Sequence, residues 1–358
     1  MHSVKRLAAI SLAVGVVALA AACGSSSSNN STSTNTGSTG AGSGTSTALN
    51  GAGSTLVAPL MSQWQPDYAT NDSVTVTYGA IGSGGGIDAI TSRSVDFGAS
   101  DAPLTADQAT ACKQCLQVPW ALGATVVTYH VSGVPDKLHL TGDVVAKIFL
   151  GQITTWNDAA IKQLNPGVNL PGTHITPVYR TDGSGDSYVF TSYLSAVSPD
   201  WKSKVGASTA PAFPTGTGTE KNSGVAAAVQ STDGSIGYVA VSYIAADSLD
   251  HALVANAAGK YVEPDLKGIL AAASAGAGPQ PDGSVPIVNP PASAATAYPL
   301  STYTYAIVPT VSPKAKTLAA FLTYAITDGQ AFGPDLGFPK LPASIVTYDK
   351  GLIAKIHT

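Results

Sequence analysis

The stretch from Tyr179 to Phe190 holds the residue types best suited to chemistry. Arg180, two aspartates, Ser184 and two glycines lie between an apolar segment that ends at Val178 and an apolar run with helical spacing. A strand that breaks at glycines and opens a helix leaves backbone N–H groups unpaired at the positive end of the helix dipole. Arg180 adds a fork of charged donors, and Ser184 adds a hydroxyl. The stretch therefore predicts an anion site.

Asp186 narrows the kind of anion. A carboxylate repels an anion unless the anion carries a proton that the carboxylate can accept. Phosphate near neutral pH carries such a proton, and sulfate does not. The alternative interpretation is an ordinary capped turn with Asp182 or Ser184 as the helix N-cap, because short Gly-Ser patterns are common.

The composition excludes attraction of an anion by an overall positive charge of the protein. The chain has 358 residues, a net charge of −4, 11% charged residues and 44% hydrophobic residues. This length allows two domains with cores of their own. The charge balance gives no reason to expect nucleic acid as a partner. Anion binding must therefore depend on local backbone dipoles and a few side chains.

The N-terminus predicts export. Lys5 and Arg6 precede an apolar run from Leu7 to Ala22, which is shorter than a membrane-spanning helix of about 20 residues and typical of a secretory signal. We expect residues 1–22 to be a signal peptide. The segment before Cys23 resembles a bacterial lipoprotein signal, in which this cysteine receives lipid such as palmitate; plain cleavage with Cys23 incidental is the alternative. Residues 23–49, rich in Gly, Ser, Thr and Asn, predict a flexible tether.

Cys112 and Cys115 form a Cys-x-x-Cys pair and leave Cys23 unmatched. A local disulfide that pins a loop is favoured in an exported chain. A thioredoxin-type redox pair is the weaker alternative, since no clear strand precedes the pair and no second Cys or His cluster accompanies it. No metal is expected, because the two thiolates lack partners at ligand spacing.

Three more segments pair a strand with a glycine- or serine-containing tip: Gly51–Leu56, Ile81–Ile87 and Val95–Asp101. A tight turn between strand and helix needs glycine for structural reasons, so each segment alone is weak evidence for a site. In open α/β sheets, however, the carboxyl ends of the strands converge on one crevice. Neither the dinucleotide fingerprint nor the nucleotide phosphate loop occurs in the chain.

The remaining chain predicts further α/β units. Apolar patterns indicate strands at 74–78, 120–129, 176–178, 236–240 and 303–308, and helices at 57–68, 143–149, 224–230, 315–326 and the end of 345–356. The segment 271–297 is rich in Ala, Gly and Pro and is expected to be a surface loop.

These motifs, in this order, resemble the substrate-binding protein of the bacterial ABC phosphate transporter, the PstS family. The resemblance runs from about Gly51 to Pro342 and includes Trp156–Asp158, Gly234–Tyr238 and Gly329–Gln330. It implies an α/β fold of the two-lobed periplasmic-binding-protein type (type II), with a hinge of two crossing strands and the ligand in the interdomain cleft. Lobe I would be 50–120 plus 298–358, and lobe II would be 121–297.

The resemblance also implies the phosphate contacts. They would be Ser54, Thr55, Leu56, Ser83 and Asp101 from the first lobe, and Arg180, Ser184, Gly185 and Asp186 from the second. Threonine is commoner at position 186, and aspartate there looks like the form in actinobacterial lipoproteins of the family. Two carboxylates facing the anion predict a preference for the dihydrogen form of phosphate and weaker binding at alkaline pH.

The implied role is capture of inorganic phosphate for ABC permease subunits by a monomeric, lipid-anchored protein on the outer face of the cell membrane. The resemblance implies no enzyme activity and no cofactor. One alternative is a binding protein for sulfate or molybdate on the same fold. Another is a phosphate-ester hydrolase with Ser184 or Ser83 as nucleophile, although neither serine lies in a Gly-x-Ser-x-Gly motif. A third is a surface adhesin or antigen without a transport role.

Overall fold

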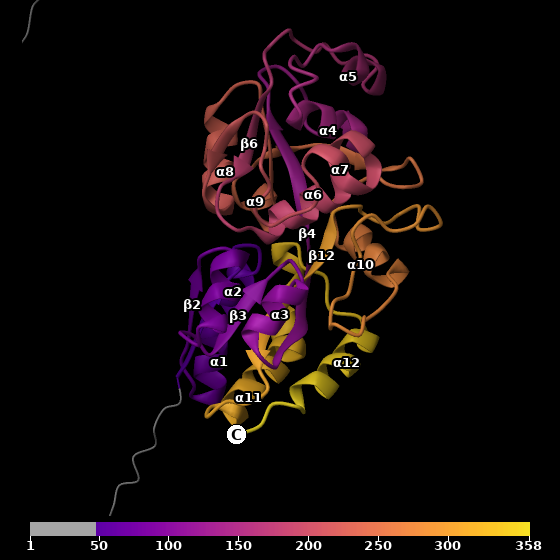
Figure 1. Ribbon diagram of the computed structural model, residues 1–358. Coiled ribbons are helices and arrows are strands. Elements are labelled where there is room, and N and C mark those ends of the chain that lie inside the picture. Colours follow the sequence, from indigo (N-terminus) through magenta and orange to yellow (C-terminus); the bar gives the residue numbers. More distant parts are fainter. Residues whose placement is uncertain (1–47) are drawn as a thin grey trace, which may run out of the picture. The chain divides into compact units, whose positions relative to one another are not determined.

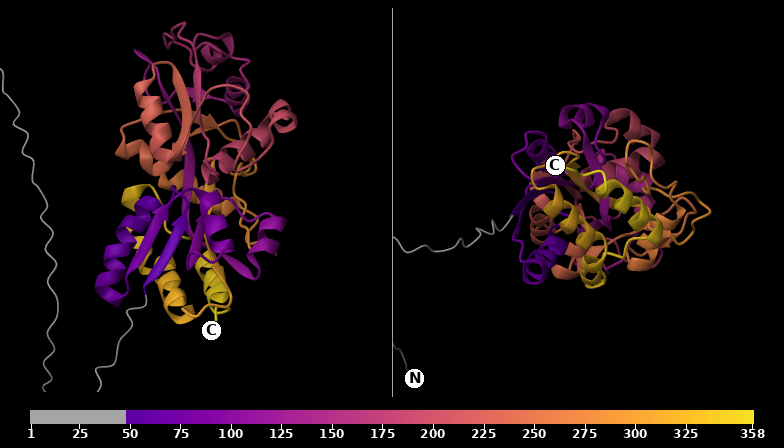
Figure 2. Two further views of the ribbon diagram at one scale, coloured as in Figure 1. Left: turned by 60° about the vertical axis from the view of Figure 1, so that its left-hand side comes forward. Right: turned by 90° about the horizontal axis from the view of Figure 1, so that it is seen from below.

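One strand, β4 (Cys115–His130), connects the two halves of a nine-stranded sheet. The computed structural model describes residues 48–358 (Figures 1 and 2). The strand order is β2-β1-β3-β12-β4-β8-β6-β7, and β9 pairs with β4 beside this path. Residues 115–124 of β4 pair antiparallel with β12, and residues 125–130 pair antiparallel with β8. Nearly every residue of β4 is buried, as expected for a central strand with covered faces.

The first lobe is the part drawn around β1–β3 in Figure 1, together with α11 and α12. Its elements before β4 are β1 (Leu49–Gly53), α1 (Ala58–Asp72), β2 (Val76–Ala80), α2 (Ser83–Thr91), β3 (Phe97–Ser100) and α3 (Ala106–Cys112). Those near the C-terminus are β12 (Ser301–Pro309), α11 (Ala315–Ile326), two short 3-10 helices (Asp328–Phe332 and Pro334–Leu336) and α12 (Ala343–Ile353). The strands β2, β1 and β3 are parallel, so their carboxyl ends lie at one edge.

The second lobe is drawn around β6 and α4–α9 in Figure 1. Its elements are β5 (His139–Leu140), α4 (Gly142–Phe149), α5 (Ala159–Leu164), β6 (Thr176–Arg180), α6 (Gly185–Val197), α7 (Pro199–Lys204), β7 (Thr217–Thr219), α8 (Lys221–Ser231), β8 (Ser235–Ala240) and α9 (Val241–Ala246). The chain continues through β9 (Asp250–His251), β10 (Leu253–Ala255), β11 (Tyr261–Val262) and α10 (Leu266–Ala275). The strands β11, β10 and β5 form a separate small sheet.

Aromatic side chains fill the core of the first lobe. Trp64 of α1 lies on the same helix face as Leu60 and Tyr68, because residues four apart are neighbours on a helix. Its ring centre is 5.4 Å from that of Trp120 in β4, and the Trp120 and Phe321 ring centres are 6.4 Å apart, both pairs edge to face. Phe321 of α11 is fully buried. This cluster fixes α1 and α11 against the strand that reaches the other lobe.

The second lobe has an equivalent cluster behind α6. Phe190 of α6 stacks on Tyr238 of β8 with ring centres 4.4 Å apart, and it meets Phe149 of α4 edge to face at 4.8 Å. The Tyr238 hydroxyl contacts Ser187 Oγ at 2.6 Å and accepts a hydrogen bond from the Arg180 backbone N–H at 3.1 Å. Core packing thus sets the position of the loop between β6 and α6.

Most element predictions are confirmed, with shifted ends. The helix at 315–326 has the predicted bounds, whereas α8 begins at Lys221 instead of residue 224. The loop prediction for 271–297 is wrong in part, because α10 continues to Ala275 from an N-cap at Asp265. Val285 and Ile287 in the same segment are buried, and the Val285 N–H donates to the Tyr305 hydroxyl at 3.0 Å.

The predictions for the signal peptide, Cys23 and nearly all of the tether lie outside the described residues. Leu49, predicted as the last residue of the tether, is instead the buried first residue of β1. In the described part of the chain, no helix combines the length and the apolar character needed to cross a membrane.

We predict that Phe321→Ala destabilises the protein by about 3–5 kcal/mol, because it removes a fully buried ring and leaves a cavity beside Trp64 and Trp120. The measurement is the free energy of unfolding from a urea titration. Phe321→Leu is the matched control and is expected to cost clearly less. Equal losses for the two variants would contradict the assigned role of ring packing.

Candidate anion-binding site

The first lobe presents a pair of hydroxyls around one carboxylate. Ser54 Oγ donates to the Asp101 oxygens at 2.6 and 2.7 Å, and Ser83 Oγ lies 3.3 Å from Asp101 Oδ2. The three side chains are at most 1% exposed. They come from the ends of β1 and β3 and from the first residue of α2, which the parallel pairing brings to one edge. Asp101 therefore lies buried among neutral donors.

The tip of β1 requires glycine. Gly53 has φ of 146°, and a Cβ there would lie 2.1 Å from the Ala99 carbonyl oxygen. This close approach lets the Ser54 N–H donate to that carbonyl at 2.9 Å and turns the chain so that the Leu56 N–H points at Ser54 Oγ, 3.0 Å away.

The second lobe contributes the loop between β6 and α6. Ser184 is the N-cap of α6, and its Oγ accepts from the Ser187 N–H at 3.2 Å. The capped-turn interpretation of this stretch is thus confirmed. It does not compete with the interpretation as a site, because the same cap directs the Gly185 N–H toward Ser83 Oγ of the first lobe at 3.1 Å.

Arg180 is a buried cation held by two carboxylates. Its Nε donates to Asp182 at 2.6 Å, and its Nη2 donates to the other oxygen of the same carboxylate. Its Nη1 lies 3.5 Å from Asp186 Oδ2 and 3.3 Å from Thr55 Oγ1 of the first lobe. The bidentate pair with Asp182 fixes the guanidinium plane, so Nη1 is directed at Thr55 of the first lobe.

The two lobes also contact each other directly, through the glycine loop before α2 and the glycine loop before α6. The Gly84 N–H donates to the Gly183 carbonyl at 2.8 Å, and a Cβ on Gly183 would lie 2.9 Å from the Gly84 Cα. The structure is therefore a closed arrangement in which all nine predicted site residues come from four neighbouring loops. They are Ser54, Thr55, Leu56, Ser83, Asp101, Arg180, Ser184, Gly185 and Asp186.

Two residues that no sequence motif indicates, Asn222 and Thr125, also belong to this site. Asn222 is fully buried, and its Nδ2 donates to Thr55 Oγ1 at 2.8 Å and to Asp186 Oδ2 at 2.7 Å. Its Oδ1 accepts from the Ala240 N–H at 2.8 Å, which fixes the amide orientation. Thr125 Oγ1 donates to Asp186 Oδ1 at 2.7 Å. No motif marks either residue, since one opens α8 and the other lies in the middle of β4.

Burial dominates the titration of the two site carboxylates. It raises the pKa of Asp101 to about 7, with a further increase from the nearby Asp186 charge and an opposing effect of the Ser54 hydrogen bond. Burial also raises the pKa of Asp186 above its ordinary value, while Arg180 and the Thr125 and Asn222 hydrogen bonds act in the opposite direction. Asp101 thus loses its proton near neutrality.

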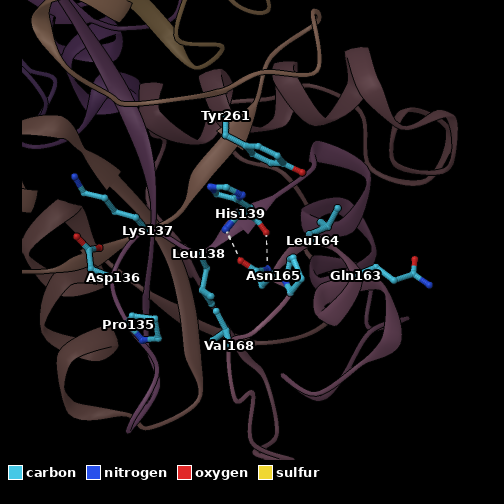
Figure 3. Close-up of a pocket in the computed structure, with 11 residues that line it drawn as sticks. Pro135, Asp136, Lys137, Leu138, His139, Gln163, Leu164, Asn165, Val168 and Tyr261 are labelled. Atoms are coloured by element: carbon cyan, nitrogen blue, oxygen red, sulfur yellow. Dashed lines mark hydrogen bonds between the residues drawn. The ribbon is translucent and has the colours of Figure 1, made fainter.

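A surface pocket of about 630 Å³ lies elsewhere, beside β5 and α5 (Figure 3). Figure 3 shows Tyr261 over the His139 ring and Asn165 bonded to the His139 backbone. Its charged groups have partners: Lys137 pairs with Glu263, and Asp136 accepts a hydrogen bond from the His251 backbone N–H at 2.7 Å. The chemistry needed for anion capture is concentrated between the lobes and not in this pocket.

Two further observations concern cysteines and metals. Cys112 and Cys115 are joined by a disulfide. Across residues 48–358, no group of three or more His, Cys, Asp or Glu side chains is arranged to hold a metal ion.

Comparison with known proteins identifies the class of protein to which this chain belongs. Residues 31–328 match the PBP superfamily domain. The chain is similar to the crystal structure of a phosphate-binding protein from Stenotrophomonas maltophilia, with a TM-score of 0.66 and 20% sequence identity. The superposition covers 85% of this chain and 93% of that protein. This likeness shows the two-lobed substrate-binding fold.

Two curated relatives give the family. Phosphate-binding protein PstS of Xylella fastidiosa is 40% identical over 304 residues, covering 83% of this chain and 82% of that protein. Phosphate-binding protein PstS 3 of Mycobacterium leprae is 34% identical over 311 residues, covering 83% of each. The chain belongs to the PstS family of phosphate-binding proteins.

We predict that the ligand-free protein becomes less stable as pH rises from about 4 to 8. Unfolded Asp101 ionises near 3.8 and folded Asp101 near 7, so between these values the folded state keeps a proton that the unfolded state has lost. Stability from this group is complete below the lower pKa and is lost through the upper one, by up to about 4 kcal/mol.

Chemical denaturation at several pH values in phosphate-free buffer measures this slope. Asp101→Asn cannot titrate and is expected to reduce this slope, leaving the contributions of Asp186 and Asp349, whose pKa values burial also raises. A wild-type slope retained in full by the variant would show that another group is responsible.

Proposed function

We propose that the protein captures inorganic phosphate outside the cytoplasm and delivers it to an ABC importer. The observation that carries this proposal is the meeting of Ser54, Ser83 and Asp101 from one lobe with Arg180 and the Gly185 N–H from the other. A tetrahedral oxyanion between these groups would replace water with a guanidinium, hydroxyls and backbone N–H donors. The chain is a binding protein and not an enzyme, in agreement with its family.

Capture would proceed by closure of the lobes about β4 and the start of β12. The Thr125 N–H donates to the Leu300 carbonyl at 3.0 Å at the point where both segments pass between the lobes. In the open form, Thr55 and Ser83 would separate from Asn222 and Gly185. A ligand that bridges the lobes stabilises the closed form by its differential affinity for the two states.

Discrimination against sulfate would depend on Asp101. A protonated phosphate oxygen can donate to this buried carboxylate, whereas sulfate near neutral pH has no proton to donate. With sulfate bound, the Asp101 carboxylate would face a sulfate oxygen with no proton between them. A buried charge left without a hydrogen-bond partner costs several kcal/mol of binding free energy. This argument favours phosphate over the sulfate and molybdate alternatives.

The role of Asp186 would differ from that of Asp101. Both carboxylates accept hydrogen bonds, but Asp186 accepts from the cation Arg180 as well as from Thr125 and Asn222. Asp101 accepts instead from the hydroxyls of Ser54 and Ser83, which can rotate toward a ligand. A preference for dihydrogen phosphate therefore requires Asn222 or Arg180 to turn from Asp186 to the ligand. If they do not turn, Asp101 is the sole proton acceptor, and monohydrogen phosphate satisfies the site.

The finer features of the proposal concern the membrane. We propose that Cys23 carries a lipid, that residues 24–48 tether the binding domain to the outer face of the cell membrane, and that the protein works as a monomer with permease subunits. The lipoprotein-like signal supports the anchor, and the low-complexity composition after it supports the tether.

Isothermal titration with phosphate tests the function, and we expect saturable binding of one phosphate per chain. Asn222→Ala should weaken this binding about tenfold, because the closed form loses two donors between the lobes. Asn71→Ala, on the exposed side of α1, is the matched control and should leave affinity unchanged. Absence of binding by the folded wild-type protein would refute the proposal.

Repeating the titration between pH 6 and 8.5 tests the protonation preference. Affinity that falls through the second ionisation of phosphate supports two proton acceptors at the site. Flat affinity rejects the preference for the dihydrogen form.

The role of Asp101 is tested by sulfate competition. Asp101→Asn replaces an acceptor-only carboxylate with an amide that can donate to sulfate. We expect the phosphate-over-sulfate ratio of affinities to fall by a factor of about 10³. An unchanged ratio in a variant that still binds phosphate would reject Asp101 as the proton-sensing group.

A further inference from the structure

The Cys112–Cys115 disulfide lies against the guanidinium of Arg93. Nη1 of Arg93 is 3.6 Å from Cys112 Sγ and 3.4 Å from Cys115 Sγ. Nη2 donates to the carbonyls of Cys112 and Lys113 at 2.7 and 3.1 Å, and Nη1 donates to the Ile90 carbonyl at 2.7 Å. These bonds hold the cation in place beside both sulfurs. A cation at this distance stabilises a thiolate relative to a thiol.

The two residues enclosed by the disulfide have an unfavourable backbone conformation. Lys113 has φ of 47° and Gln114 has φ of 60°, which is the left-handed region that residues with a Cβ seldom adopt. The disulfide closes the short ring that contains them. Cleavage of the S–S bond would let this backbone relax, which favours the reduced form.

The two sulfurs differ in access. Cys112 is 1% exposed and packs with Ile90 and Leu104 in a small apolar cluster, whereas Cys115 is half-buried. Cys115 lines an open surface pocket of about 580 Å³. The other pocket residues are Gln114, Leu116, Thr310, Val311, Lys355 and His357. Lys355 and the exposed Lys113 give this approach a positive charge, so an anionic thiol could reach Cys115 but not Cys112.

We propose that Cys112–Cys115 is a thiol–disulfide exchange site for small anionic thiols and not a permanent cross-link. The incoming thiolate attacks Cys115 Sγ, a new S–S bond forms there, and the Cys112–Cys115 bond breaks. The electron pair of that bond goes to Cys112 Sγ, which leaves as a thiolate beside Arg93. A second thiolate then attacks the small-molecule sulfur of this mixed disulfide. The bond to Cys115 breaks, Cys115 Sγ leaves as a thiolate, and the two small thiols are released as a disulfide. The protein disulfide gains two electrons, and two thiols lose them.

Reduced glutathione is the probe for the full-length protein. After acid quenching and alkylation, trypsin cleavage at Lys113 separates the two cysteines, with Cys115 in the peptide Gln114–Lys137. Without denaturant, we expect glutathione on this peptide and an alkylated Cys112, which marks the thiol that the exchange released. Arg93→Gln should slow exchange about tenfold through loss of thiolate stabilisation, and Arg93→Lys should lie between.

Three outcomes would overturn the proposal. The first is exchange that occurs only in denaturant, and the second is glutathione attached first to Cys112. The third is faster exchange in Arg93→Gln, which would mean that Arg93 protects a structural disulfide from attack. If Arg93→Gln fails to fold, Lys355→Gln provides an independent test. It should slow exchange with glutathione but not with neutral 2-mercaptoethanol, and Lys260→Gln, away from the pocket, is its control. Equal rates for Lys355→Gln and Lys260→Gln with glutathione would also overturn the proposal.

Discussion

The central constraint on this structure is one buried cation among three carboxylates. Arg180 lies with Asp182 and Asp186, and Asp101 faces them from the other lobe. Buried charges are costly unless each has a partner and satisfied hydrogen bonds. Asp182 and Asp186 obtain these from Arg180, Thr125 and Asn222, and Asp101 obtains neutral donors from serines. This excess of acceptors is the reason for our proposal that the site prefers a protonated oxyanion to an unprotonated one.

The fold supplies this arrangement by bringing loops from distant parts of the chain together. Parallel strands in the first lobe direct the tips of β1 and β3 to one edge, and β6 does the same in the second lobe. The single strand β4 connects the two halves of the nine-stranded sheet and also contributes Thr125 to the site. The strand that connects the lobes therefore also supplies one donor to the hydrogen-bond network.

Sequence patterns predicted the loops better than the network between them. The glycine and serine tips were visible because tight turns and helix N-termini restrict residue types. The partners of Asp186 were not visible, because Asn222 and Thr125 carry no local signal and lie 36 and 61 positions from it. The prediction of a surface loop at 271–297 was wrong in part for a similar reason, because distant residues determine the structure of this segment. Its Ala and Gly content indicates a loop, but an N-cap at Asp265 extends α10 into it, and contacts with Tyr305 bury its middle.

By itself, the sequence determined the α/β class, the order of most elements and the four loops that we propose bind an anion, because these follow from local periodicity, turn chemistry and helix capping. Tertiary structure alone decided which partners each site carboxylate has. Asp101 and Asp186 are the same residue type beside similar loops, and local sequence cannot tell them apart. Packing gives Asp186 an arginine, a threonine and an asparagine, and it gives Asp101 two serines, while burial raises the pKa of both carboxyls.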